Sequence, residues 1–195
     1  KAVLEKITQD HPNGTRAWIQ LARNATHEGD TDRIGEILDR GLAVNPQDIP
    51  LLWAKASYLQ TQNDIDGAIE IYEEVYARDT QSVIIANNLA SMLATFRDVE
   101  ESLRRAGAIA RRLKDTDVPA FQDTYGWIQH RNGTPQEALN YLEPAAEVLS
   151  GDASVQYHLG AVYEALGERD KALEQMRKAA DTLDGSTEAL RATIQ

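Results

Sequence analysis

Small and apolar residues recur along this chain with a period of 34 residues. Ala22, Ala56 and Ala90 are each 34 residues apart, and so are Gly126 and Gly160. Around these positions, apolar residues recur every three or four residues, a spacing typical of amphipathic helices. A repeat of this length and periodicity predicts antiparallel pairs of helices, each pair stacked on the next.

Five full repeats and two flanking pieces can be placed along the chain. The full repeats span 15–48, 49–82, 83–118, 119–152 and 153–185. Residues 1–14 fit the second helix of an earlier repeat, and 186–195 fit a short capping helix that begins at Ser186. We therefore expect one solenoid over 1–195. Since the chain opens inside a helical pattern without a methionine, we also expect it to be a fragment of a longer protein.

The helix boundaries follow from the turn residues. First helices are predicted near 15–28, 49–62, 82–95, 119–131 and 153–166, and second helices near 31–44, 65–77, 98–113, 135–148 and 169–183. Gly29, Gly133 and Gly167 suit the positive φ that follows a helix end. Thr134-Pro135-Gln136-Glu137 predicts a capping box with proline at the first helical position.

The repeated residues resemble the tetratricopeptide repeat family over nearly the whole chain. The resemblance implies an all-α superhelical solenoid of antiparallel helix pairs with a concave groove. Asn87-Asn88-Leu89-Ala90 and Tyr157-His158-Leu159-Gly160 are similar to repeats of bacterial tetratricopeptide lipoproteins tied to envelope and exopolysaccharide systems of the exosortase-associated type. That similarity implies the bacterial envelope or periplasm, and the cytoplasm remains an alternative.

In this family one stripe of each first helix lines the groove. On that stripe we place ten candidate partner-binding residues: Ile19, Arg23, Trp53, Ser57, Asn87, Ser91, Asp123, Trp127, His130 and Tyr157. Trp53 and Trp127 are the expected anchors with accessible rings, because tryptophan is enriched at binding hot spots. The alternative is that both belong to the core, as we expect for Trp18.

Several positions depart from the family pattern. Lys55, Gln122, Gln129 and Gln156 occupy core-type positions, so either their polar ends reach outward or the packing is loose there. The family's carboxylate clamp for C-terminal peptide tails uses lysine and asparagine early in the groove. Ile19 and Arg23 occupy those places here, which does not support that class of partner.

Composition excludes several classes of function. The net charge of −11 disfavours nucleic acid and anionic membranes as partners. With no cysteine, the chain has neither disulfides nor thiol chemistry. No apolar run approaches the roughly 18 residues that membrane insertion needs. The four histidines form no metal-binding pair, and no catalytic or cofactor motif is present. One basic stretch (Arg104, Arg105, Arg111, Arg112 and Lys114) fits a solvated outer face.

These observations predict a non-catalytic scaffold that binds a peptide or helix of another protein in its concave groove. Self-assembly into homodimers through the repeat ends is the main alternative. A third reading is an accessory part of an enzyme whose active site lies elsewhere in the parent chain. No metal and no cofactor are expected.

Overall fold

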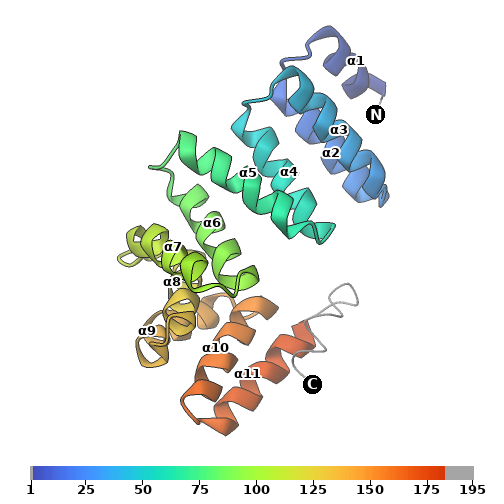
Figure 1. Cartoon of the computed structure of the whole chain (residues 1–195). Helices are drawn as coiled ribbons and strands as arrows, with labels where there is room; N and C mark the ends of the chain where they lie inside the picture. The colour runs from blue at the N-terminus through green and yellow to red at the C-terminus, as the bar shows by residue number, and fades with distance from the viewer. Residues whose placement is uncertain (1, 183–195) are drawn as a thin grey trace. The chain divides into compact units, whose positions relative to one another are not determined.

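Residues 2–182, which this computed structural model describes, form antiparallel helix pairs without a strand (Figure 1). The α-helices are α1 (Ala2–Asp10), α2 (Thr15–Glu28), α3 (Thr31–Val44), α4 (Ile49–Thr61), α5 (Ile65–Arg78), α6 (Val83–Phe96), α7 (Glu100–Ala110), α8 (Pro119–Arg131), α9 (Pro135–Val148), α10 (Ala153–Ala165) and α11 (Arg169–Thr182). After α7 the chain tightens into a 3₁₀ turn, η1 (Arg111–Leu113). The predicted helices are confirmed, and the helix expected from Ser186 lies outside the described residues.

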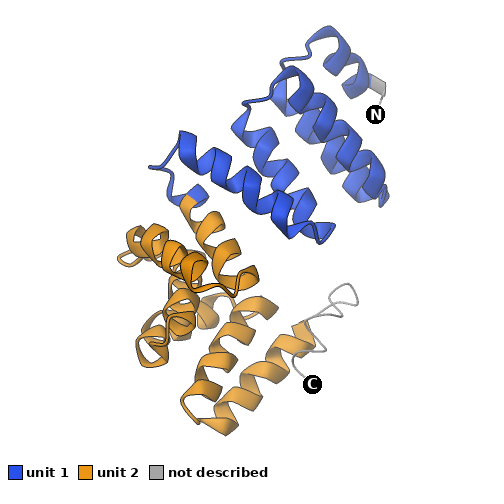
Figure 2. Ribbon diagram, in the orientation of Figure 1, with its two compact units in different colours: residues 1–85 blue, residues 86–195 orange. Residues whose placement is uncertain are grey.

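The helices belong to two compact units (Figure 2). In unit 1, residues 1–85, α2 packs on α3 and α4 packs on α5, while α3 also contacts α4. In unit 2, residues 86–195, α8 packs on α9 and α10 packs on α11, while α9 contacts α10. Each unit therefore stacks one helix pair on the next. One continuous right-handed superhelix over 1–195 stays a prediction.

The small residues of the repeat lie where helices approach closely. A Cβ on Gly126 would lie 2.7 Å from Leu142 Cγ, and one on Gly160 would lie 3.2 Å from Met176 Cε. Ala56 and Ala90 are fully buried. The predicted role of this position in helix packing is confirmed.

Each unit has its own apolar core. In unit 1 the core includes Trp18, Leu21, Leu38 and Leu51. The indole nitrogen of Trp18 donates to the Pro12 carbonyl at 2.8 Å, so its buried polar atom is satisfied. In unit 2 the core includes Leu139, Leu142, Val155, Leu159 and Val162. The core assignment of Trp18 is confirmed.

The turns confirm the glycine predictions and correct the capping box. Gly29, Gly133 and Gly167 have φ of 72°, 84° and 78°. Thr134 makes no side-chain hydrogen bond to the start of α9; its hydroxyl lies 2.9 Å from the Gln129 carbonyl and donates to it. That carbonyl also accepts from the Thr134 backbone N–H at 3.0 Å, and the Glu137 N–H donates to the Thr134 backbone carbonyl at 3.1 Å instead of to the hydroxyl. The predicted capping box is wrong for this reason.

Two of the polar side chains at core-type positions, Lys55 and Gln156, have polar partners inside the protein. Lys55 Nζ lies 2.6 Å from Asp39 Oδ1 and 5.3 Å from the centre of the Tyr58 ring. Gln156 is buried, and its amide nitrogen donates to the Ala146 carbonyl at 3.0 Å. Pairing allows these residues to replace apolar ones without a large cost.

Candidate functional site

A pocket of about 400 Å³ lies in unit 1 between α2, α3 and α4. Four of the predicted partner-binding residues line it together, namely Ile19, Arg23, Trp53 and Ser57. The remaining lining residues are mostly apolar: Ala22, Thr26, Ile34, Leu38, Pro50, Ala54, Tyr58 and Thr61. The structure thus brings these four predicted residues onto one surface, and their binding role stays a prediction.

Helical periodicity explains why α2 and α4 both face the pocket. Ile19, Arg23 and Thr26 follow one another at spacings of four and three residues, which places them on one side of α2. Pro50, Trp53 and Ser57 repeat the pattern on α4 at spacings of three and four. The opposite sides of the two helices carry buried core residues, among them Trp18, Leu21, Leu51 and Leu52. The pocket therefore lies directly on the unit 1 core, and Ala22 and Leu38 belong to both.

Trp53 is the most exposed large aromatic side chain of the pocket. Its exposed fraction is 51%, so the predicted accessibility of this ring is confirmed. The buried Tyr72 hydroxyl of α5 donates to Gln60 Oε1 of α4 at 3.3 Å. Burial raises the pKa of Tyr72, while the Ser57 and Trp53 side chains act in the opposite direction. Tyr72 thus links α5 to α4, the helix that carries Trp53.

Sequence reasoning missed Tyr72 because it occupies an ordinary core position on a second helix. A buried tyrosine usually needs a hydrogen-bond partner for its hydroxyl. That need is the signal in the sequence that could have linked Tyr72 to polar residues of the neighbouring helix.

Gly35 makes room for another wall of the pocket. A Cβ at Gly35 on α3 would lie 2.8 Å from the Tyr58 hydroxyl oxygen, so only glycine lets the Tyr58 ring lie this close to α3. The Lys55 ammonium lies over the same ring, 5.3 Å from its centre, while it also pairs with Asp39. The Tyr58 wall is therefore held by its neighbours on α3 and α4.

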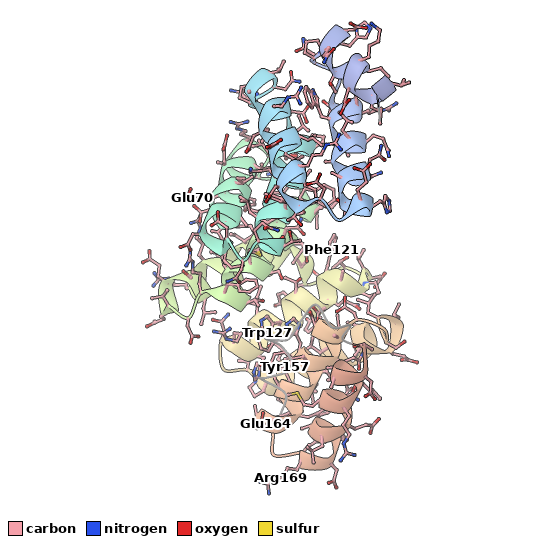
Figure 3. All side chains as sticks on the ribbon, turned by 90° about the vertical axis from the view of Figure 1, so that its right-hand side faces the viewer. Glu70, Phe121, Trp127, Tyr157, Glu164 and Arg169 are labelled. Carbon is pink, nitrogen blue, oxygen red and sulfur yellow. The ribbon has the colours of Figure 1, made fainter. Side chains whose placement is uncertain are left out.

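The predicted residues of unit 2 form a closed cluster instead of an open groove. The Trp127 ring stacks on His158 with centroids 4.2 Å apart and on His130 at 5.1 Å. Tyr157 of α10 lies beside it at 6.1 Å, and Figure 3 labels both Trp127 and Tyr157. Only 6% of Trp127 is exposed. Its predicted accessibility is wrong, because rings from α8 and α10 cover it.

Asp123, which we expected to meet a partner from the groove, is buried in the same cluster. His158 Nδ1 lies 2.9 Å from Asp123 Oδ1 across 35 residues of sequence. The carboxylate therefore has a partner inside the protein and does not face an open groove. Sequence reasoning missed His158 as that partner, although an acid and an imidazole on consecutive first helices are a usable signal.

His130 is half-buried and lies beside two other basic side chains. Burial lowers the pKa of His130, and the nearby Arg131 and His158 lower it further. Its imidazole is therefore neutral near pH 7. On α6, Asn87 and Ser91 are half-buried, and Asn87 Nδ2 donates to Asn88 Oδ1 at 3.3 Å. Roles for Asn87, Ser91, His130 and Tyr157 in partner binding stay predictions.

The lining of the unit 1 pocket is mostly apolar and has few polar groups. Its lining has hydroxyl groups and one guanidinium, but no carboxylate, imidazole or thiol. Residues 2–182 hold no group of three or more side chains arranged to bind a metal ion. Over the same residues, no helix has the length and apolar character to cross a bilayer.

Comparisons with known proteins agree with the fold. A TPR repeat-containing protein of Pseudomonas aeruginosa is 26% identical over 158 residues, or 80% of this chain, which spans about a quarter (26%) of that relative. TTC0263, a TPR protein of Thermus thermophilus, has a TM-score of 0.69 and 19% identity; the match covers 93% of this chain and 97% of TTC0263. YrrB, described as a TPR protein with an unusual peptide-binding site, has a TM-score of 0.62 and 19% identity, with 98% of each chain covered.

A tetratricopeptide repeat model matches residues 54–118 and 126–187. These ranges make up more than half of the sequence and include helices of both units. The chain belongs to the tetratricopeptide repeat family.

Proposed function

We propose that this chain is a non-catalytic scaffold that binds a peptide or helix of a partner protein in the unit 1 pocket. The observation that carries this proposal is the half-exposed Trp53 ring beside a pocket of about 400 Å³ with a mostly apolar lining. A large aromatic side chain held at an apolar pocket is typical of interface hot spots. The pocket is large enough for one or two apolar side chains of a partner.

The fold supports a protein as the bound species. Tetratricopeptide solenoids present the faces of consecutive first helices, and α2 and α4 are two such helices. A similar structure, YrrB, is itself described as having a peptide-binding site. With Trp127 buried, Trp53 is the single tryptophan anchor of the proposal.

Selection from a displayed library of random peptides of about a dozen residues tests this proposal. Peptides selected on the whole chain are measured against Trp53→Ala and a matched control, Leu173→Ala. Leu173 lies on α11 of unit 2 and is 53% exposed, close to the 51% of Trp53. We expect Trp53→Ala to weaken binding about 30-fold, which corresponds to about 2 kcal/mol, and Leu173→Ala to leave it unchanged. Equal binding by both variants would contradict the proposal.

Self-assembly through the repeat ends is a second candidate, favoured by one observation. Val3 and Ile7 on α1 are exposed apolar residues, at 72% and 37%. If this face mediates dimers, light scattering will show mass rising with concentration, and Val3→Glu with Ile7→Glu will abolish the rise. A constant monomer mass over the whole range would exclude this candidate.

A role in the bacterial envelope or in exopolysaccharide export completes the proposal. It is supported by the resemblance of the Asn87-Asn88-Leu89-Ala90 and Tyr157-His158-Leu159-Gly160 strings to repeats of envelope-associated proteins. Fractionation of cells that produce the full-length parent protein tests it, and recovery in the cytosol alone would refute it.

A further inference from the structure

Helices α2 and α4, which carry Arg23 and Trp53, have the opposite charge balance to the chain as a whole, whereas α3, the third helix of the pocket, has three acidic and two basic residues. The chain has 31 acidic and 20 basic residues. Counted in the same way, as lysine plus arginine against aspartate plus glutamate, α2 and α4 together have Arg16, Arg23 and Lys55 against Glu28. A local excess of positive charge on an acidic protein favours negatively charged partners at that place.

Two of these charges already have partners inside unit 1. Lys55 is bound to Asp39 of α3, with 2.6 Å between nitrogen and oxygen. Glu28 accepts from Arg33 Nη1 at 3.1 Å. The two remaining charges, Arg16 and Arg23, are exposed and have no ion-pair or hydrogen-bond partner among residues 2–182.

The two unpaired arginines lie on the pocket side of α2. Arg23 lines the pocket itself. Arg16 precedes it by seven residues, with Ile19 between them, so all three side chains follow one stripe of the helix. No acidic residue lines the pocket, so its own walls cannot neutralise Arg23.

Building on the proposed function, we propose that the partner segment places a carboxylate beside its apolar anchor and pairs it with Arg23. The apolar side chain enters the pocket against Trp53, and an aspartate or glutamate next to it meets the Arg23 guanidinium. A wholly apolar segment would partly desolvate Arg23 without pairing it, and a basic segment would be repelled. An internal acidic residue suffices, and no free C-terminus is needed.

The peptide library tests this inference separately from the proposed function. Selected peptides are synthesised with acetylated and amidated ends, so that only side chains carry charge. Binding is measured to the wild-type chain, to Arg23→Glu and Arg23→Gln, and to the control Arg177→Glu. Arg177 is an exposed arginine on α11 of unit 2, so its reversal changes the net charge of the chain equally.

We expect acidic residues to be enriched beside the apolar anchor, and Arg23→Glu to weaken these peptides about tenfold or more. Arg23→Gln will weaken them less, Arg177→Glu will have little effect, and added salt will reduce the affinity for the wild-type chain. Peptides that need Trp53 but lack acidic enrichment, or that tolerate Arg23→Glu, would overturn the inference and leave the proposed function standing. Peptides that do not need Trp53 would overturn both.

Discussion

Alanine at two equivalent glycines should have opposite effects on stability. Gly126 and Gly160 occupy the same position in consecutive repeats, inside α8 and α10. A Cβ at Gly126 would lie 2.7 Å from Leu142 Cγ and 3.2 Å from the Ala138 carbonyl oxygen. At Gly160 the nearest atoms all belong to the flexible Met176 side chain, at 3.2–3.3 Å.

The size of the difference follows from two terms. Replacing glycine by alanine inside a helix stabilises it by about 1 kcal/mol at both sites. At Gly126 this gain is opposed by overpacking of about 1–3 kcal/mol, because a branched side chain and backbone cannot both move away. At Gly160, Met176 can change its rotamer, so most of the gain remains. Gly126→Ala should therefore be less stable than Gly160→Ala by about 1–3 kcal/mol.

Urea unfolding followed by circular dichroism measures this difference. The urea concentrations at half unfolding can be compared if the unfolding free energies of the two variants depend on urea with the same slope. Because both variants share the gain in helix propensity, it cancels in the comparison and only the packing term remains. Equal midpoints for the two variants, or a lower midpoint for Gly160→Ala, would refute the packing argument. Gly160→Leu, which is too large for Met176 to accommodate by a rotamer change, should cost about 1–3 kcal/mol.

Three further predictions concern His130, Leu159 and the tryptophans. Because burial lowers the pKa of His130 below 6.5, its contribution to stability is present above pH 6.5 and is lost as the pH falls through the folded-state pKa. Urea midpoints between about pH 7.5 and about pH 5 should therefore fall more steeply for the wild type than for His130→Phe, and parallel curves would contradict this. Leu159→Ala should lower the free energy of unfolding by about 2–5 kcal/mol in urea, since Leu159 is buried in the unit 2 core. A loss no larger than that of the exposed Leu173→Ala would count against this prediction. In acrylamide quenching, Trp53→Phe should remove most of the quenchable fluorescence and Trp127→Phe should remove little of it. The reverse order would mean that Trp127 is the solvent-exposed ring.

The fold was predictable because it depends on positions that the period alone identifies. The stripe of α2 and α4 was predictable for a similar reason, since helical spacing alone places Ile19 and Arg23 on one side of α2, and Trp53 and Ser57 on one side of α4. Burial of Trp127 was not predictable in this way. It depends on which side chain the next first helix presents, and here His158 brings an imidazole that stacks on the indole. The period locates a side chain on its helix, but the identity of a neighbour in the next repeat, here His158 for Trp127, decides whether that side chain meets solvent.

A similar competition explains the error at Thr134. The motif predicts that the Glu137 N–H donates to the Thr134 hydroxyl oxygen, but this N–H donates to the Thr134 backbone carbonyl at 3.1 Å. The Thr134 hydroxyl donates instead to the Gln129 carbonyl at the end of α8, which also accepts from the Thr134 backbone N–H.

The contrast between Trp53 and Trp127 has a consequence for how this protein can change over time. Substitutions around the open Trp53 ring alter what the surface recognises and disturb few internal contacts, so new specificities can arise there without loss of folding. Around Trp127, by contrast, Asp123 of α8 pairs with His158 of α10, and the Trp127 and His158 rings stack. Most replacements in this cluster would therefore weaken unit 2. Among relatives with the same repeats, we expect the residues of the Trp53 pocket to diverge with the partner and the Trp127 cluster to vary only as a set.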